Sequence, residues 1–375
     1  MPALDAHLEQ KLKLLASKHL LREPVTTSRT KGVQVERGGK TLISFSCNDY
    51  LGLSHHPEVI KAAQEATAAY GAGAGASRLV TGNYPLYDEL ETILAGYKGT
   101  QAACIFGSGY LANLGTIPAL VSAGDLIIAD KLSHACMLDA ARLSGATLMR
   151  FAHNNIPHLR MLLSANRTEH HNCLIITETI FSMDGDAAPI PELYQLAEEY
   201  DAWLMTDDAH GLGIISSQKA HIQMGTLSKA AGSYGGYVCG SKTVIDYIKT
   251  SARSLIYSTG LPPASLAVSI AALKLMKNDK TLGEKALENA RYFTALLGLP
   301  DAQSTIVPVI VKENEKALEL STKLEDQGFL VSAIRPPTVP EHTARLRFTF
   351  SALHEKHQIE AVANILKSEG IPCAS

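Results

Sequence analysis

Short apolar segments alternate with longer segments of helical pattern through the middle of this chain. The apolar segments are bounded by Gly, Asp or Ser and span residues 102–106, 126–129, 174–177, 203–206 and 237–239. Helix-length segments lie between them, such as residues 191–200, which open with a proline at a first-turn position. This alternation predicts an α/β domain built on a largely parallel sheet.

The pattern changes after about residue 262. A long Ala/Leu/Lys-rich helical stretch runs to about residue 298, and strand candidates (304–311, 345–350) then alternate with helix candidates (315–327, 358–367). Helices on a small sheet indicate a separate α+β domain. We therefore expect an N-terminal helix and strand segment (1–45), a large α/β domain (46–262) and a small C-terminal α+β domain (263–375), with the first segment packed beside the last.

The charge balance and the hydropathy pattern exclude several classes of function. The chain has 375 residues, of which 46% are hydrophobic, and a formal net charge of -3. It therefore offers no excess basic charge for nucleic acid or an anionic membrane. The N-terminus reads as an amphipathic helix rather than a signal peptide, and no apolar run reaches the roughly 20 residues that span a bilayer. We expect a cytoplasmic protein.

The cysteines do not form a recognisable framework. They lie at positions 47, 104, 136, 173, 239 and 373, with no C-x-x-C pair. Cys104, Cys136, Cys173 and Cys239 lie in or beside apolar runs, which favours buried free thiols over disulfides or a zinc site. We expect no metal site, because no third ligand can be nominated beside the DDAHG segment at 207–211.

Lys229 lies in a loop of small residues, TLSKAAG (226–232), and DDAHG (207–211) ends an apolar run about twenty residues earlier. A lysine amine can form a Schiff base with the aldehyde of pyridoxal 5′-phosphate (PLP), and an aspartate can keep the pyridine nitrogen protonated, so that the ring accepts electrons. Asp207 and His210 directly follow a strand candidate, at the edge where open α/β sheets bind ligands. An acidic turn with a helix cap is the alternative.

Two glycine-rich segments are candidates for binding phosphate. Gly71, Gly73 and Ala76 match the dinucleotide fingerprint G-x-G-x-x-G/A, but a helical pattern precedes them where the fingerprint needs a strand, so an NAD site is disfavoured. FGSGY (106–110) follows a strand candidate and opens a helical segment, whose exposed amides would bind phosphate well. An ordinary glycine turn is the alternative there.

Single polar residues give weaker signals. His134 follows another strand end, where a lone histidine is more often a surface or capping residue. Arg345 and Arg347 alternate with apolar residues on one strand candidate. Both could form its solvent face, or one of them could clamp a substrate carboxylate through two hydrogen bonds.

Together these segments resemble the α-oxoamine synthases, a family of PLP-dependent enzymes of fold type I. The resemblance covers nearly the whole chain and is carried by CNDYLGL (47–53), SGY (108–110), LSHA (132–135), FSMDGD (181–186), DDAHG (207–211) and IYST (256–259). It implies the fold-type I transferase fold, with a large domain on a mostly parallel sheet and a smaller C-terminal α+β domain. AIRPPTVP (333–340), ahead of ARLR (344–347), is similar to the member of the family that acts in biotin biosynthesis.

The resemblance implies catalytic and cofactor-binding roles around the PLP ring. Lys229 would carry the cofactor and serve as the base, and Asp207 would pair with the pyridine nitrogen. His210 would contact the phenolic oxygen, His134 would stack on the ring face, and Ser182 would sit beside the ring.

The resemblance also implies how the phosphate is held. Gly109 and Tyr110 would bind it through backbone amides, and Thr226 would add a hydroxyl. Ser258 and Thr259 would reach the phosphate of the neighbouring subunit, so the active form would be a homodimer with shared active sites.

The implied reaction joins L-alanine to a pimeloyl thioester, with release of CO₂ and the free thiol carrier. Asn48 and Arg347 would hold the amino-acid carboxylate, with His134 beside it, and the substrate entrance would include Arg22, Arg335 and Thr338. Pimeloyl-CoA and pimeloyl-acyl carrier protein both present the same thioester arm, so the sequence leaves the acyl donor open.

Other interpretations stay open within and beyond the family. A 2-amino-3-ketobutyrate CoA ligase would join glycine to acetyl-CoA instead, and 5-aminolevulinate synthase and serine palmitoyltransferase are further members. A non-catalytic partner subunit of the same fold is a different class, and the presence of Lys229 argues against it. One departure is a short segment between Gly213 and Lys229, where family members carry about ten more residues. Residues 222–225 must then replace the strand that leads to the lysine, and the shortening puts full activity in doubt.

Overall fold

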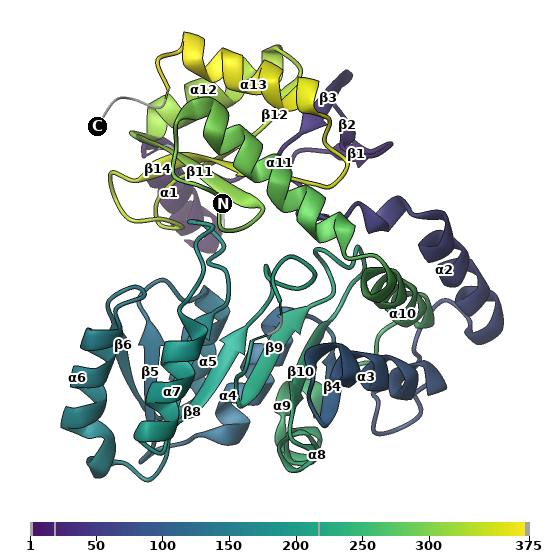
Figure 1. The fold of residues 1–375 in the computed structure, drawn as a ribbon, viewed down its shortest axis with the longest axis vertical. Helices are drawn as coiled ribbons and strands as arrows, with labels where there is room; N and C mark the ends of the chain where they lie inside the picture. Colours follow the sequence, from purple (N-terminus) through teal and green to yellow (C-terminus); the bar gives the residue numbers. More distant parts are fainter. Residues whose placement is uncertain (1–2, 19, 217, 372–375) are drawn as a thin grey trace.

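The protein is described by a computed structural model over residues 3–18, 20–216 and 218–371. One seven-stranded sheet has the order β4-β10-β9-β8-β7-β5-β6, and two smaller sheets have the orders β1-β2-β3-β12 and β11-β14-β13. Figure 1 shows the large sheet in the lower part of the molecule and the smaller sheets in the upper part. The predicted α/β class with a mostly parallel main sheet is confirmed.

The large sheet is buried on both faces. Its strands are β4 (Ala102–Phe106), β5 (Leu126–Asp130), β6 (Thr147–Phe151), β7 (Cys173–Glu178), β8 (Trp203–Asp207), β9 (Ile222–Thr226) and β10 (Gly236–Gly240). Neighbouring strands pair in parallel along the run β9-β8-β7-β5-β6, whereas β10 runs antiparallel to both β4 and β9. All residues of β5, β7 and β9 are buried, as the near-continuous apolar runs predict.

Helices cover each face of this sheet. They are η1 (Leu53–His55), α2 (Pro57–Tyr70), α3 (Pro85–Lys98), α4 (Gly109–Leu120), α5 (Ala135–Ser144), α6 (Ile156–Asn166), η2 (Arg167–Glu169), α7 (Ile190–Glu199), α8 (Lys242–Ser251) and α9 (Arg253–Ile256). Alternate side chains of β5 point to opposite faces. Ile127 therefore packs in one core with α4, α5 and α8, and Ile128 packs in another with α6 and α7.

The smaller sheets bring the two ends of the chain together. Their strands are β1 (Thr27–Arg29), β2 (Gln34–Arg37), β3 (Lys40–Ser44), β11 (Ile306–Lys312), β12 (Phe329–Leu330), β13 (Ser332–Ile334) and β14 (Ala344–Thr349), and helices α12 (Asn314–Asp326) and α13 (Lys356–Ser368) accompany them. β3 pairs in parallel with β12. Phe45 packs edge-on against Phe348 and Phe350. The N-terminal segment thus packs beside the C-terminal one, as the sequence predicts.

The helical stretch after residue 262 is two helices rather than one. α10 (Pro263–Asn278) and α11 (Thr281–Leu297) are separated at Asp279, whose carboxylate accepts hydrogen bonds from the backbone and hydroxyl of Thr281. Such a side-chain cap satisfies the first amides of a new helix and ends the previous one. α10 shares a core with α3 and with Tyr50 and Leu53, so it packs against the large sheet's layer. The boundary expected at residue 262 remains a prediction.

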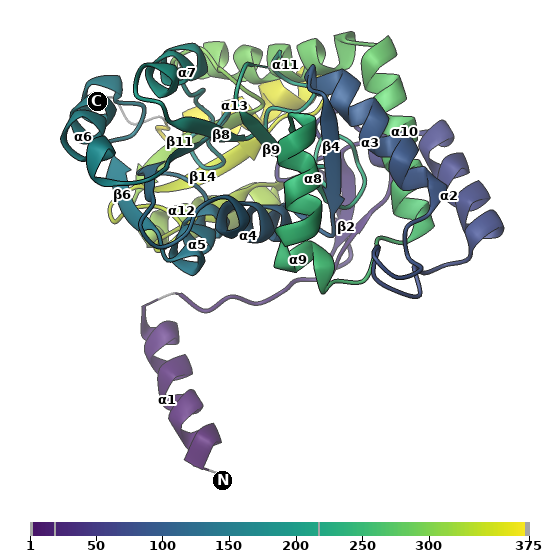
Figure 2. The same ribbon diagram turned by 90° about the horizontal axis from the view of Figure 1, so that it is seen from below.

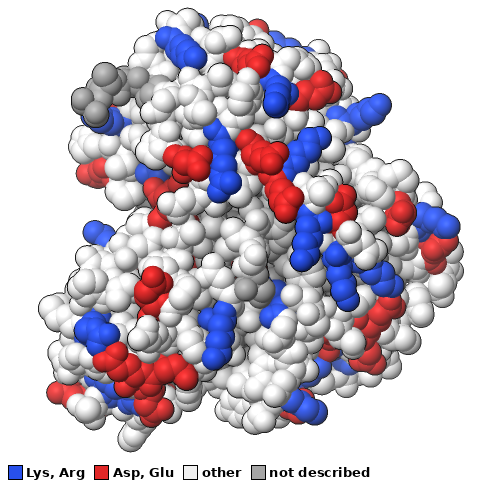
Figure 3. Space-filling view, viewed as in Figure 1, with Lys and Arg blue, Asp and Glu red and all other residues white. Residues whose placement is uncertain are grey.

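The N-terminal helix α1 (Ala3–Ser17) projects away from the body, as Figure 2 shows, and none of its residues is buried. Within the described residues, no helix is long and apolar enough to cross a membrane. Basic and acidic side chains are interspersed on the face in Figure 3. Among described residues the five cysteines at 47, 104, 136, 173 and 239 are free, and all but Cys47 are buried, as predicted. Cys373 lies outside the described residues.

Candidate active site

Three chain segments converge on one cavity at the carboxyl edge of the large sheet. β8 ends at Asp207, β9 ends at Thr226, and α4 begins at Gly109 soon after β4. β4, β8 and β9 run in the same direction, so these ends meet at one edge. The cavity has a volume of about 190 Å³. It is lined by Ser108, Gly109, Tyr110, His134, Cys136, Glu178, Asp207, Ala209, His210, Met224, Thr226, Ser228 and Lys229.

The structure therefore brings together many of the residues singled out in the sequence. Those that line the cavity are Gly109, Tyr110, His134, Asp207, His210, Thr226 and Lys229. They lie at or shortly after the ends of four strands, β4, β5, β8 and β9, and their roles toward a cofactor remain predictions.

The amine of Lys229 lies at the cavity wall, with Nζ 2.8 Å from Nε2 of His210. Burial lowers the pKa of Lys229, and the nearby carboxyl groups of Asp207 and Glu178 oppose this shift. A lower pKa leaves more of the amine neutral, and only the neutral amine can act as a nucleophile or accept a proton.

A hydrogen-bonded chain runs from Lys229 to Arg347. The Tyr50 hydroxyl lies 2.6 Å from Nδ1 of His210 and donates to Oδ1 of Asn48 at 3.2 Å. Nη1 of Arg347 donates to the same amide oxygen at 3.4 Å. Burial lowers the pKa of His210 well below its usual range, so its ring is neutral, with one donor and one acceptor nitrogen. One ring nitrogen of His210 therefore contacts the Tyr50 hydroxyl and the other contacts the Lys229 amine.

The adjacent residues Asp207 and Asp208 have different partners. Asp207 accepts hydrogen bonds from Nδ2 of Asn113 and from the backbone N–H of Ala209, both at 2.9 Å. Burial raises the pKa of Asp207, and Lys229 and these hydrogen bonds oppose the shift. Asp208 does not line the cavity.

The start of α4 forms a cradle of backbone amides at one end of the cavity. The Ser108 hydroxyl caps the helix by accepting from the N–H of Leu111 at 3.2 Å, and Gly109 and Tyr110 follow at the first positions. A side chain at Gly109 would fill the cradle, because its Cβ would lie 3.3 Å from Cβ of Thr226. First-turn amides without helical partners suit an anion such as phosphate.

These residues fit PLP. The amide cradle suits its phosphate, the Lys229 amine suits its aldehyde, and the Asp207 carboxylate suits its pyridine nitrogen. All three groups line the same cavity, so a single cofactor can meet them together.

Gly236→Ala is expected to weaken PLP binding. A Cβ at this position would lie 2.4 Å from the carbonyl oxygen of Ser108 and 2.6 Å from the nitrogen of Gly109, so the cradle would have to shift. Overpacking of this kind costs about 1–3 kcal/mol, which corresponds to roughly a 5- to 100-fold loss of affinity. Titration of the apoprotein with PLP, followed by visible absorbance, measures it. Gly96→Ala is the control, because its Cβ would meet no atom within 4 Å; equal affinities in the two variants would contradict the cradle.

His134 caps a helix and also lines the cavity, while its stacking on the cofactor ring stays a prediction. Its Nδ1 accepts the backbone N–H of Cys136 at 3.2 Å and so caps α5, while its side chain lines the cavity. Burial lowers the pKa of His134, although the carboxylate of Asp207 raises it. The lowered pKa favours the neutral form of the imidazole at the cavity.

Three polar residues of the site were not identified from the sequence. Glu178 ends β7 and lines the cavity, and burial raises its pKa well above the usual range. Its position at a strand end was a readable signal, because Asp207 was found by the same rule. Asn113 lies four residues after Gly109, on the same side of α4, and Tyr50 lies within the CNDYLGL segment. Only their tertiary contacts show that they hold Asp207 and His210.

Several expected site residues lie outside this cavity. Ser182 is adjacent, and its backbone N–H donates to Oε2 of Glu178 at 3.3 Å. Ser258 and Thr259 line a separate, much smaller space together with Arg78 and Tyr87. In this one chain they do not line the Lys229 cavity. The resemblance assigns them to the phosphate site of the neighbouring subunit, which a single chain does not test.

The interpretation of Arg345 and Arg347 as a solvent face is wrong. All six residues of β14 are buried, so both guanidinium groups point into the protein. Arg345 pairs with the carboxylate of Asp184 at 2.6 Å. Arg347 donates through Nε to the carbonyl of Ser182 at 2.6 Å and reaches Asn48, which leaves it as the arginine connected to Lys229.

The residues expected at the substrate entrance do lie together. Nη2 of Arg22 donates to the Thr338 hydroxyl at 3.0 Å. Both residues, with Arg335, line a cavity of about 310 Å³ between the N-terminal segment and β13.

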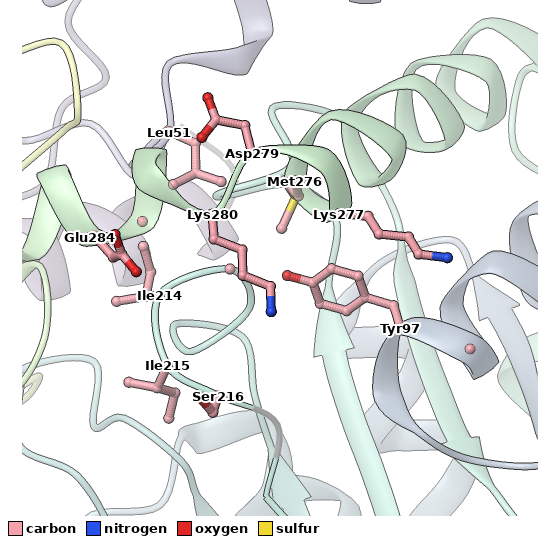
Figure 4. Close-up of a pocket in the computed structure, with 13 residues that line it drawn as sticks. Leu51, Tyr97, Ile214, Ile215, Ser216, Met276, Lys277, Asp279, Lys280 and Glu284 are labelled. Carbon is pink, nitrogen blue, oxygen red and sulfur yellow. The ribbon is translucent and has the colours of Figure 1, made fainter.

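The short connection between β8 and β9 still delivers Lys229. Residues 222–226 form the complete strand β9, as the sequence required. The connection borders a further cavity of about 390 Å³, shown in Figure 4. There Ile214 and Ile215 lie on one side, and the side chains of Tyr97 and Lys280 point toward one another. The short connection thus borders this separate cavity, and Lys229 still lines the cavity that contains Asp207 and His210.

Comparisons with known proteins agree with this geometry. The family model for aminotransferase class I and II matches residues 40–366. The chain is 55% identical over 370 residues to an 8-amino-7-oxononanoate synthase of Methylobacterium nodulans, covering 98% of each chain. It is 56% identical over 365 residues to the enzyme of the same name in Methylorubrum extorquens, covering 97% of this chain and 95% of the relative.

Solved structures share the fold at lower identity. A serine palmitoyltransferase from S. paucimobilis with a bound PLP–myriocin aldimine has a TM-score of 0.90 and 28% identity, covering 98% of this chain and 97% of that one. An 8-amino-7-oxononanoate synthase from Francisella tularensis has a TM-score of 0.76 and 27% identity, covering 88% and 97%.

Proposed function

This chain belongs to the aminotransferase class I and II family and, within it, to the 8-amino-7-oxononanoate synthases, and we propose on that basis that it condenses L-alanine with a pimeloyl thioester in biotin biosynthesis. The products are 8-amino-7-oxononanoate, CO₂ and the free thiol carrier. The observation that carries the proposal is the convergence of Lys229, Asp207 and the start of α4 on one cavity. A cytoplasmic location is part of the same proposal.

PLP is the cofactor, and when bound it supplies an aldehyde that condenses with amines and a ring that accepts an electron pair. Asp207, whose carboxyl group is held by Asn113 and Ala209, would pair with the ring nitrogen and keep a proton there. His134 lines the cavity as a neutral ring suited to stacking.

The carboxylate of L-alanine is assigned to Arg347 and Asn48. The two residues already share a hydrogen bond at 3.4 Å, and the guanidinium offers further N–H groups to a carboxylate. Binding there would hold the α-carbon of alanine toward Lys229, because the chain through Tyr50 and His210 links the two ends of the site. Holding the α-carbon C–H bond in a fixed orientation would lower the activation barrier for proton removal.

The proton transfers are assigned to Lys229. Its Nζ is buried with a lowered pKa, so it can accept the proton from the α-carbon of alanine. The α-carbon then bonds to the thioester carbonyl carbon, and the thiolate leaves with a proton as the free thiol. Loss of the carboxylate as CO₂ leaves an electron pair at the same carbon, which takes up a proton. One proton left the α-carbon and two are delivered, to the thiolate and to this carbon, so the second comes from water. His210, with Nε2 2.8 Å from Nζ, would orient the amine through a hydrogen bond.

The acyl donor is assigned to the cavity lined by Arg22, Arg335 and Thr338. Two guanidinium groups suit an anionic group, either the free carboxylate of the pimeloyl chain or a phosphate of the carrier arm. Coenzyme A and acyl carrier protein share that arm, and parallel assays with both donors distinguish them.

A homodimer with shared active sites is the second part of the proposal. Ser258 and Thr259 do not line the Lys229 cavity of their own chain, and the neighbouring Leu79, Val80 and Tyr257 expose 61%, 73% and 73% of their surface. An exposed apolar patch beside hydroxyl groups suits a subunit contact in which those hydroxyls reach the partner's phosphate site. Sedimentation equilibrium of the purified protein tests it, and a monomer under assay conditions would contradict it.

A substrate panel tests the proposed reaction. L-alanine, glycine and L-serine are each offered with pimeloyl, acetyl and palmitoyl thioesters, and thiol release is measured together with CO₂. We expect the highest kcat/KM for L-alanine with the pimeloyl thioester. Preference for glycine with acetyl-CoA would indicate a 2-amino-3-ketobutyrate CoA ligase and overturn the assignment. A protein that binds PLP but turns over no pair would indicate the non-catalytic partner subunit.

A further inference from the structure

A histidine outside the cavity joins two loops that carry site residues. Nδ1 of His153 lies 3.0 Å from Oδ1 of Asp130, and Nε2 lies 2.8 Å from Oδ2 of Asp186. The next residue, Asn154, repeats the link: its backbone N–H donates to Asp130 at 2.9 Å and its side-chain amide donates to Asp186 at 2.8 Å. Four polar contacts from two consecutive residues thus connect the two carboxylates.

The Asp130 end of this link orders the turn before His134. Asp130 is the last residue of β5 and is fully buried. Its carboxylate accepts the backbone N–H of Leu132 at 2.7 Å, and its carbonyl accepts that of Ser133 at 3.1 Å. A shift of Asp130 would therefore move the turn that leads into His134.

The Asp186 end holds the loop that seats Arg347. The N–H of Phe181 donates to the carbonyl of Asp186 at 3.0 Å, so residues 181–186 close into a hairpin. Within that hairpin the carbonyl of Ser182 accepts Nε of Arg347 at 2.6 Å. A shift of Asp186 would therefore move a direct contact of the guanidinium group.

His153 is charged in this arrangement. Burial lowers its pKa, but the hydrogen bonds and charges of Asp130 and Asp186 outweigh burial and raise the pKa to about 10. Both ring nitrogens then donate, one to each carboxylate. The edge-on ring of Phe181, 4.3 Å away between centroids, fixes the orientation of the imidazolium.

We propose that His153 is a positioning residue for the amino-acid substrate, setting the spacing between the turn that presents His134 and the hairpin that seats Arg347. The inference rests on the proposed function, in which Arg347 holds the carboxylate of L-alanine and His134 lies beside the cofactor ring to which the amino acid is presented. His153 itself does not line the cavity, so it acts through Asp130 and Asp186.

His153→Asn is expected to raise the KM for L-alanine about tenfold or more, because small misplacements of a substrate clamp are costly. The KM for the pimeloyl thioester should change less than about twofold, since its entrance lies elsewhere. PLP affinity should fall less than the affinity for L-alanine, because Lys229, Asp207 and the start of α4 hold the cofactor independently of this link. An equilibrium titration of the PLP-loaded protein with L-alanine, read by visible absorbance, gives a second measure of the same loss that does not depend on turnover.

His221→Asn is the matched control. Its Nε2 lies 2.8 Å from Glu198, and its side chain is 26% exposed against 27% for His153, but it lies at the other end of β9. We expect it to leave both KM values unchanged. Asp186→Asn should reproduce the alanine defect, and the double variant His153→Asn/Asp186→Asn should be no worse than the poorer single one. The single variant Asp186→Asn also tests the link if His153→Asn fails to fold.

The possible failures can be told apart. A wild-type protein that does not condense L-alanine with a thioester removes the proposed function itself. An active wild type whose His153→Asn and Asp186→Asn variants bind L-alanine as the His221→Asn variant does overturns the positioning role alone. Equal losses for L-alanine and the thioester would also overturn it, because they indicate general loosening.

Discussion

Lys229→Ala is expected to reduce condensation by about 10³-fold or more, since it removes the group that both carries the cofactor and moves the proton. The other nitrogen bases among the residues that line the cavity are His134 and His210. Neither imidazole can form a Schiff base, and the lowered pKa of each ring makes it a weaker base. Thiol release with L-alanine and the pimeloyl thioester measures the loss. The visible absorbance of the bound cofactor should change at the same time, because its aldehyde has no lysine partner.

Two comparisons distinguish a loss of activity from a loss of folded protein. Lys242→Ala removes a lysine that is exposed and pairs only locally with Asp246, so activity should match the wild type. Lys229→Ala should keep a Tm within a few degrees of the wild-type apoprotein, because its amine is a buried, partly desolvated group rather than a packing element. Retention of more than about a tenth of the turnover in Lys229→Ala would rule out its assigned role.

The cofactor side of the site was readable from the sequence because it follows strand ends. A buried parallel strand needs an apolar run, and the residue after that run must lie at the ligand-binding edge. Asp207, His210 and Gly109 were found in this way. Lys229 needed its small-residue loop as an additional signal, and the strand β9 before it formed although the connection from β8 is short.

The residues that hold His210 and the other strand-end residues in place could not be found by the same reasoning. Tyr50 is more than 150 positions from His210 in the sequence, and its contact depends on the packing of the segment before α2 over the sheet edge. The burial of Arg345 was missed for a related reason. An Arg-Leu-Arg-Phe alternation predicts one polar face, whereas the 181–186 hairpin from the large sheet covers that face and supplies its acceptors.

Asp207 and Asp208 have different partners in the structure, although they are adjacent in the sequence. Consecutive residues at the end of a strand point in different directions. Asp207 faces the cavity of Lys229, whereas Asp208 is buried against Lys98 at 2.7 Å and accepts from the Thr179 hydroxyl at 2.6 Å. The adjacent carboxylates thus have separate surroundings: Asp207 lies at the cavity, where the proposed function gives it a role in chemistry, and Asp208 joins α3 to the sheet.

Exchanging each aspartate for asparagine should separate those roles. Asp207→Asn is expected to lower kcat by about 10²- to 10³-fold, because it removes the charge that keeps the cofactor nitrogen protonated. Its Tm should stay near that of the wild type, since burial already disfavours the charged carboxylate. Asp208→Asn removes the carboxylate from the buried ion pair with Lys98 and should destabilise the protein by about 3–5 kcal/mol, as breaking a buried pair does.

Thermal or urea unfolding of the apoproteins measures the stability of both variants, and kcat is measured with L-alanine and the pimeloyl thioester at a temperature where both remain folded. Asp208→Asn should then turn over substrate within about tenfold of the wild type, because Asp208 does not line the cavity. If Asp208→Asn were the less active of two equally stable variants, the two roles would have to be exchanged. The reciprocal pattern, a stable but slow Asp207→Asn beside an unstable but active Asp208→Asn, follows only if the first carboxylate serves the cofactor and the second serves the fold.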